Sequence, residues 1–144
     1  MAGDITADNF FREILDQVPE FEWKVNAERK SITERGGDPE DVDHLKYNPY
    51  SLAFELFTGL VVPALRATDA MDSQEDFLAR CFTLLERAAA TSDSYVRDNM
   101  ALAVADFLVG DLGPTAYAHA GLEFRALMAE CLADEGLEIP ASWL

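Results

Sequence analysis

Apolar residues recur every three or four positions along most of this chain, which is the spacing of one face of an α-helix. The most regular run, near the C-terminus, consists of Tyr117, Ala120, Gly121, Phe124, Leu127, Met128, Cys131 and Leu132. No sustained alternation of apolar and polar residues lies between turn signals, so the sequence offers no clear strands. With 144 residues, a common size for one domain, the chain is expected to form a single all-α domain over residues 1–144.

Two helices are predicted in the N-terminal third. The first begins at a Thr6 cap and ends before Pro19, because the residue preceding a proline avoids the α region. The second begins at Glu20, where Glu20 and Lys24 are spaced to pair on one face, and is stopped by Gly36.

A central helix is predicted to open at Asn48, an N-cap residue followed by Pro49 at the first helical position, and to run toward Thr68. Its apolar residues cover nearly every face, which indicates a helix surrounded by others. Pro63 is expected to kink this helix or to end it at Val62.

The C-terminal half predicts an antiparallel hairpin and one long last helix. Residues 73–76 resemble a capping box, and residues 91–93 break that helix and cap the next one. The last helix begins at Pro114 and ends near Gly136, and Trp143 in the tail is expected to dock on the body. The expected architecture is about five or six helices in antiparallel hairpins, as a bundle or as HEAT-like stacking.

Three features favour a cytoplasmic protein. Cys81 and Cys131 fall on predicted buried faces, and two cysteines do not make a disulfide framework. Residues 1–4 lack the start of a signal peptide, and the longest apolar stretch, residues 52–65, is too short to span a bilayer.

The net charge is −16, from 27 acidic and 11 basic residues, and it is spread along the chain: −6 over residues 1–50, −4 over 51–100 and −6 over 101–144. A field of this sign repels phosphate backbones and anionic lipids, so neither nucleic acid nor a membrane surface is an expected partner. A basic protein is an expected partner, since opposite charges steer association. Solubility alone is an equally open explanation of the acidity.

The region between Gly36 and Asn48 has few apolar residues and is predicted to be an exposed acidic loop. The acids beside His44 offer oxygen ligands for a hard cation. The order of residues in this region lacks the glycine and the distal glutamate of a calcium-binding loop, so no metal site is predicted. We expect this acidic loop to contact a partner instead. Trp23, on the preceding predicted helix, is a possible aromatic anchor, and Asp106, on the second helix of the predicted hairpin, is a further candidate acid. The candidate partner-binding residues are Asp38, Glu40, Asp41, Asp43, Trp23 and Asp106.

Catalytic residues and cofactors are not predicted. The chain lacks the common nucleotide, zinc and acyl-transfer motifs, and only His44 and His119 could act as acid–base groups near neutral pH. His119 lies beside the apolar stripe of the last predicted helix, where a partly buried structural histidine is the expected role. Asp106 and Asp111 border an apolar face, where carboxylates more commonly cap neighbouring helices than form sites.

Residues 92–101, with Ala103 and Leu108, look like the second helix of a HEAT-type repeat, which implies stacked helical hairpins. A wider resemblance is to small acidic all-helical immunity-type proteins of bacterial polymorphic-toxin systems. It is carried by Val18-Pro19-Glu20-Phe21, the 77–90 helix with Leu84-Leu85-Glu86, Ser92-Asp93, Val96 to Leu108, and Gly113-Pro114. This resemblance implies a helical fold and a role in recognition, with no catalytic residues; the segment from Gly36 to Asn48 departs from the family pattern.

The leading hypothesis is therefore a non-catalytic, immunity-type domain that neutralises a basic toxin effector by occlusion. One alternative is a helical scaffold or regulatory adaptor, for which the acidity only maintains solubility. A third is an enzyme with a cryptic metal–carboxylate site in a helical bundle; such sites use inward Glu-x-x-His pairs, and none occurs in this chain.

Overall fold

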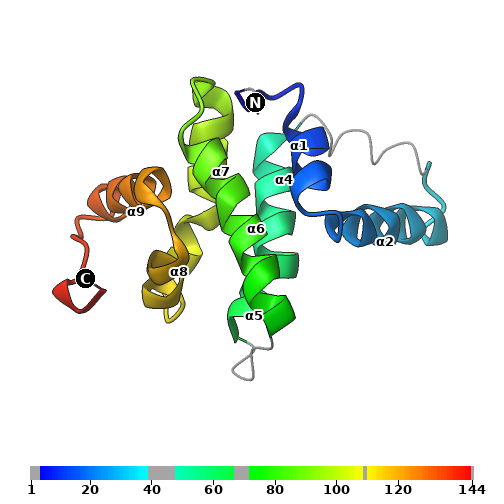
Figure 1. Cartoon of the computed structure of the whole chain (residues 1–144). Helices are drawn as coiled ribbons and strands as arrows, with labels where there is room; N and C mark the ends of the chain where they lie inside the picture. Colours follow the sequence, from blue (N-terminus) through cyan, green and yellow to red (C-terminus); the bar gives the residue numbers. More distant parts are fainter. Residues whose placement is uncertain (1–3, 39–47, 67–71, 109, 144) are drawn as a thin grey trace.

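The computed structural model describes residues 4–38, 48–66, 72–108 and 110–143, and this part of the chain is all-α, with no strand (Figure 1). The elements are α1 (Phe10–Gln17), α2 (Phe21–Glu34), α4 (Pro49–Leu56), a π-helical turn (Phe57–Val61), α5 (Val62–Arg66), α6 (Asp72–Ala89), α7 (Ser94–Leu108), α8 (Gly113–His119), α9 (Leu122–Asp134) and a 3₁₀ turn (Ala141–Trp143). The predicted all-α class is confirmed.

The helices α4, α6 and α7 form the centre of the molecule, with α1 and α2 on one side and α8 and α9 on the other (Figure 1). Helix α4 packs most extensively against α7. The buried residues form one apolar cluster that includes Phe10, Phe21, Phe57 and Phe124, each fully buried. Burial of a Phe side chain contributes about 1.5–3 kcal/mol, so these four rings are major contributors to the stability of the core.

Several predicted helix ends are confirmed. The Asn48 side chain accepts the backbone N–H of Ser51 at 3.1 Å, which caps α4. The Asp93 carboxylate accepts the N–H of Tyr95 at 3.0 Å, which caps α7. Gly36 and Gly136 follow the ends of α2 and α9 and terminate these helices, with φ angles of 80° and 75° in the left-handed region that glycine adopts without strain.

Two local predictions in the N-terminal third are wrong. The N-cap of α1 is Asn9, not Thr6, because the backbone between them makes a turn in which the Thr6 carbonyl accepts the N–H of Phe10 at 2.9 Å. Glu20 does not pair with Lys24: it binds Arg80 on α6, while Lys24 lies 3.8 Å from Glu55 on α4. Partners from other helices were available to both side chains, and a sequence pattern does not reveal them.

The central helix continues through Pro63 to Arg66, so of the two predicted alternatives, a kink at Pro63 or an end at Val62, the end at Val62 is excluded. A proline lacks the N–H for the bond to the residue four positions back, and its ring clashes with that carbonyl. The helix absorbs this with a π turn, in which the N–H of Val62 donates to the carbonyl of Phe57, five residues back.

The predicted last helix is two helices, with Ala120 and Gly121 extended between α8 and α9. The Glu86 carboxylate of α6 accepts the N–H groups of Glu123 at 2.6 Å and Phe124 at 2.9 Å. These are the free donors of the first turn of α9, and a carboxylate there also meets the positive end of the helix dipole. A side chain on α6 therefore caps the start of α9.

The C-terminal tail packs on the body of the molecule. Trp143 packs on Tyr117 of α8, with ring centroids 5.8 Å apart, which confirms that it docks on the body. Helix α6 begins at Asp72, one residue before the predicted cap Ser73, whose side chain lies outside the described residues. No described helix combines the length and the apolar character needed to cross a membrane.

Candidate functional site: an acidic groove between two helices

The candidate partner-binding residues from the sequence are only partly covered by the structure. Trp23, in the first turn of α2, is 72% exposed, while Asp38 is exposed beyond the far end of the same helix. Glu40, Asp41 and Asp43, with His44, lie outside the described residues. Asp106 belongs to α7, but its side chain is also outside the described part. The two side chains that the structure describes thus belong to opposite ends of one helix.

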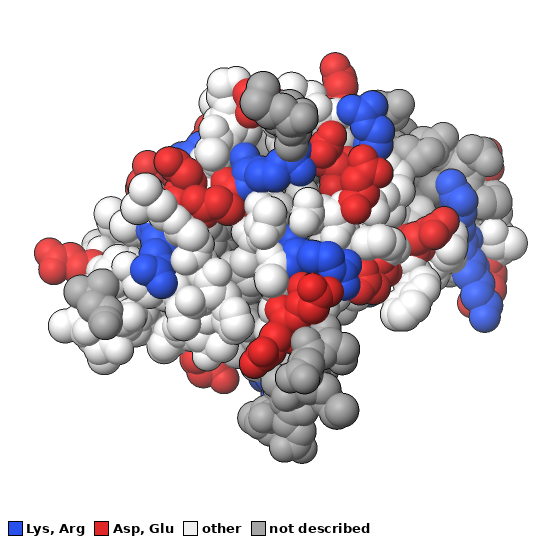
Figure 2. Space-filling model, viewed as in Figure 1, with Lys and Arg blue, Asp and Glu red and all other residues white. Residues whose placement is uncertain are grey.

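The arginines on the central helices pair with acids of the same chain. Arg80 makes two hydrogen bonds with Glu20, at 2.9 and 2.7 Å, and this contact lowers the pKa of the Glu20 carboxyl from its ordinary value. Arg87 likewise lies 2.9 Å from Glu13. Figure 2 shows acidic side chains in several separate patches on the visible face, and basic side chains mostly adjoin them. Internal pairing of the cations therefore leaves the excess of carboxylates exposed.

The segment before α1 is held on the turn between α6 and α7 by side-chain hydrogen bonds. The Asp4 carboxylate accepts the backbone N–H of Ser92 at 3.1 Å and also the Ser92 hydroxyl, and these bonds lower the pKa of Asp4. Asp93 accepts the N–H of Ala7 at 3.0 Å while it also caps α7. The buried Thr91 hydroxyl donates to the carbonyl of Ile5. These carboxylates have structural partners, which gives them a role in folding.

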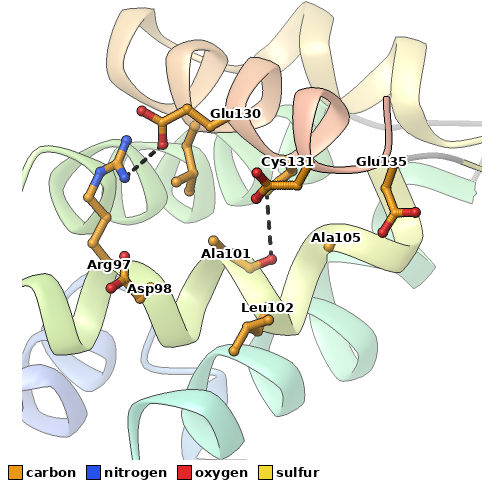
Figure 3. Close-up of a pocket in the computed structure, with 10 residues that line it drawn as sticks. Arg97, Asp98, Ala101, Leu102, Ala105, Glu130, Cys131 and Glu135 are labelled. Atoms are coloured by element: carbon orange, nitrogen blue, oxygen red, sulfur yellow. Dashed lines mark hydrogen bonds and ion pairs between the residues drawn. The ribbon is translucent and has the colours of Figure 1, made fainter. Parts of the chain in front are cut away.

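A groove lies between α7 and α9 and encloses about 370 Å³ (Figure 3). Its apolar surface comes from small side chains of α7, Ala101 and Ala105, and from Leu127 and Cys131 of α9. Leu102 lies at the edge, on the side of α7 away from α9, and is 66% exposed. The concave apolar surface is therefore bordered by an apolar side chain that faces solvent.

Charged residues surround this apolar surface. Arg97 of α7 pairs with Glu130 of α9 at 2.8 Å and also donates to the carbonyl of Ala89 at 3.1 Å (Figure 3). The other charged residues of the lining are Asp98, Asp134 and Glu135, so four carboxylates and one guanidinium border the groove. Within the described residues, none of these three acids makes a salt bridge.

The two cysteines are buried free thiols, as predicted. Burial raises the pKa of Cys81 to about 12, and burial together with Asp134 and Glu130 raises the pKa of Cys131. Both side chains are therefore neutral at physiological pH, and the Cys131 thiol contributes an uncharged surface to the groove.

The structure corrects the expected burial of His119. Its ring is exposed and stacks on Phe82 of α6, with centroids 5.4 Å apart. Asp111, the other acid considered as a helix cap, is exposed and lies 3.8 Å from Arg66. Among the described residues there is no group of three or more His, Cys, Asp or Glu side chains placed to hold a metal ion.

The groove was not predicted from the sequence. Its signal was present in part: Ala101 and Ala105 are spaced one helical turn apart on a single face of α7, and Asp98 and Leu102 border that face. The spacing of apolar residues did not reveal the break between α8 and α9 at Gly121, and this break fixes where α9 lies against α7.

No protein-family model matches the chain, and no curated protein or solved structure shows significant similarity to it. The relationships to HEAT repeats and to immunity-type proteins therefore stay at the level of sequence resemblance.

Proposed function

We propose that this chain is a non-catalytic protein-binding domain that recognises a basic protein, and that it acts as an immunity-type inhibitor of a toxin effector by occlusion. The observation that carries the proposal is the exposed excess of carboxylates left after the central arginines pair with Glu13, Glu20 and Glu130. With a net charge of −16, the molecule attracts a basic protein over long range.

Two further observations support this proposal. The apolar groove between α7 and α9 offers a surface that can be desolvated on binding, which sets the lifetime of a complex, whereas charge mainly sets the association rate. Trp23, 72% exposed on α2, is a second side chain of the type enriched at the centres of interfaces.

The proposal is tested with the product of the gene adjacent to this one in the native host. That product is expected to be basic and toxic when expressed alone, and co-expression of this chain is expected to restore growth. The purified pair should form a stoichiometric complex whose association rate falls steeply between low and physiological salt. A neighbouring product that is neither toxic nor bound by this chain, with no basic protein bound elsewhere in the genome neighbourhood, would refute the proposal.

Neutralising the acids of the loop distinguishes the proposed function from the scaffold or adaptor alternative. Neutralising the four loop acids, with Asp38, Asp41 and Asp43 replaced by Asn and Glu40 by Gln, should slow association if acids outside the groove help to steer the partner. If the acidity serves only solubility, the same variant should bind its partner at an unchanged rate. Lys30→Gln, at an exposed base on α2, is a control that removes a charge of the opposite sign.

A further inference from the structure

The groove between α7 and α9 combines three properties that are not found together elsewhere among the described pockets: an apolar surface, carboxylates on its border and an exposed leucine at its edge. We propose that this groove is the docking site for the basic partner, and that it takes an apolar side chain of the partner flanked by lysine or arginine residues. The inference rests on the proposed function and deepens it by naming the site and the chemistry of the bound segment.

The size of the groove suits an inserted side chain. Its volume of about 370 Å³ lies at the lower end of the roughly 300–1,000 Å³ typical of ligand pockets. Ala101 and Ala105 leave this space open because neither side chain extends beyond its β-carbon. Leu127 lies at the bottom with 1% exposure, so an entering apolar group meets packed side chains of the core.

The carboxylates at one end of the groove favour the binding of a cation. Asp134 and Glu135 stand at the C-terminal end of α9, where the helix dipole is itself negative, and no basic residue lies in the last turn. Acids at that end of a helix are unfavourable, and a lysine or arginine of a bound partner would relieve this repulsion. Asp98 of α7 adds a third carboxylate at the border.

The other end of the groove already contains a cation of the same chain, Arg97. Glu130 is paired with Arg97 at 2.8 Å, and this hydrogen bond, together with the nearby charge of Asp98, raises the pKa of the guanidinium. A partner cation is thus directed to Asp134 and Glu135, and the apolar group beside it lies over Ala101 and Ala105. The expected recognition element is an apolar residue with a lysine or arginine within about one helical turn.

The first experiment uses synthetic peptides as probes of the whole chain. One peptide is an amphipathic helix of leucine, lysine and alanine, the second replaces its leucines with serine, and the third replaces its lysines with glutamate. Titration of ¹⁵N-labelled protein should shift the amide signals of Ala101, Ala105, Leu127 and Cys131 with the first peptide only. Shifts spread over the acidic surface, equal binding of the serine peptide, or no binding of the first peptide would each overturn the inference.

The second experiment uses charge-matched variants with the full basic partner. The groove variant carries Asp134→Lys and Glu135→Lys; the control carries Asp8→Lys and Asp16→Lys, at exposed acids of the α1 region. The groove variant should bind at least about tenfold more weakly, a loss of about 1.4 kcal/mol, and the control less than about twofold more weakly. Circular dichroism verifies that both variants fold.

A single apolar change supplies an independent readout. Leu102→Asp alters an exposed residue and should leave the fold intact while weakening binding of the leucine peptide and the partner about tenfold. If the partner binds wild type and all groove variants equally, the docking site is wrong while the proposed function stands. If no basic protein binds the wild type, the proposed function fails, and the peptide titration alone then decides whether the groove recognises this chemistry.

Discussion

The Glu86 carboxylate occupies the space beside Gly121 where any larger residue would place its β-carbon, which would lie 2.6 Å from the carboxylate carbon. The same carboxylate accepts the N–H groups of Glu123 and Phe124. A larger residue at position 121 would therefore displace the carboxylate that caps α9.

Gly121→Ala is expected to destabilise the protein by about 1–2 kcal/mol, because the added methyl group displaces the Glu86 cap. Glu86→Ala should cost a similar amount. In the Glu86→Ala background, however, Gly121→Ala should stabilise by roughly 0.4–1 kcal/mol, since the three atoms nearest to the added methyl group all belong to Glu86 and alanine restricts the unfolded chain. Urea unfolding of the four proteins in this double-mutant cycle measures the change of sign; additive losses would contradict it.

Glu20→Gln is expected to lower the free energy of unfolding at pH 7 by about 1 kcal/mol, because Glu20 and Arg80 form a two-bond, partly buried pair. The Glu20 pKa is lowered on folding, so its contribution is complete above the unfolded value of 4.5 and is lost as the pH falls through the lower folded value. Unfolding curves from neutral pH to about pH 3 should therefore converge for wild type and variant. Glu22→Gln, at an exposed position on the same helix, is the control, and an equal loss in it would assign the effect to overall charge.

Asp93→Ala is expected to destabilise the protein by about 1–2 kcal/mol, because it removes the cap of α7 together with the bond to the N–H of Ala7. The amide of Ala7 should also exchange with solvent faster in the variant, which hydrogen exchange measured by NMR detects. Asp8→Ala, in the same turn region but exposed, should change stability by less than about 0.5 kcal/mol. Unchanged exchange at Ala7 would show that other contacts hold the N-terminal segment.

Cys81 and Cys131 are expected to resist alkylation by iodoacetamide in the folded protein at pH 8. Burial raises the pKa of both thiols, to about 12 for Cys81, so the reactive thiolate is scarce. Cys131 borders the groove and should react first, whereas the unfolded protein should be modified at both sites quickly. Mass spectrometry over time gives the two rates, and rapid modification of Cys81 in the folded state would contradict its burial.

Helix formation was predictable where the signal is local. The Asn48-Pro49 start and the Asp93 cap each depend on residues within one turn of the helix end, so the sequence contains all of the relevant chemistry. The burial of both thiols also followed from the spacing of apolar residues, and the docking of Trp143 followed from the apolar residues in the tail.

Two of the wrong predictions share one physical cause, which is competition from partners distant in the chain. Glu20 was within reach of Lys24 but bonded to Arg80, sixty residues away. The run from Pro114 to Gly136 has helical spacing throughout, yet Glu86 supplies a cap that makes a second helix start at Leu122 favourable. The groove is a product of that break, so it was not predictable from helical spacing alone.

Helix α9 forms one wall of the groove and is held at its first turn by hydrogen bonds to Glu86. The α9 residues that line the groove lie in its later turns. A change at residue 86 is expected to alter how that wall is held without altering the wall's own chemistry. If the groove binds a partner as proposed, selection on affinity can then act through a position outside the contact surface, and closely related chains are expected to differ in affinity while presenting identical contact residues.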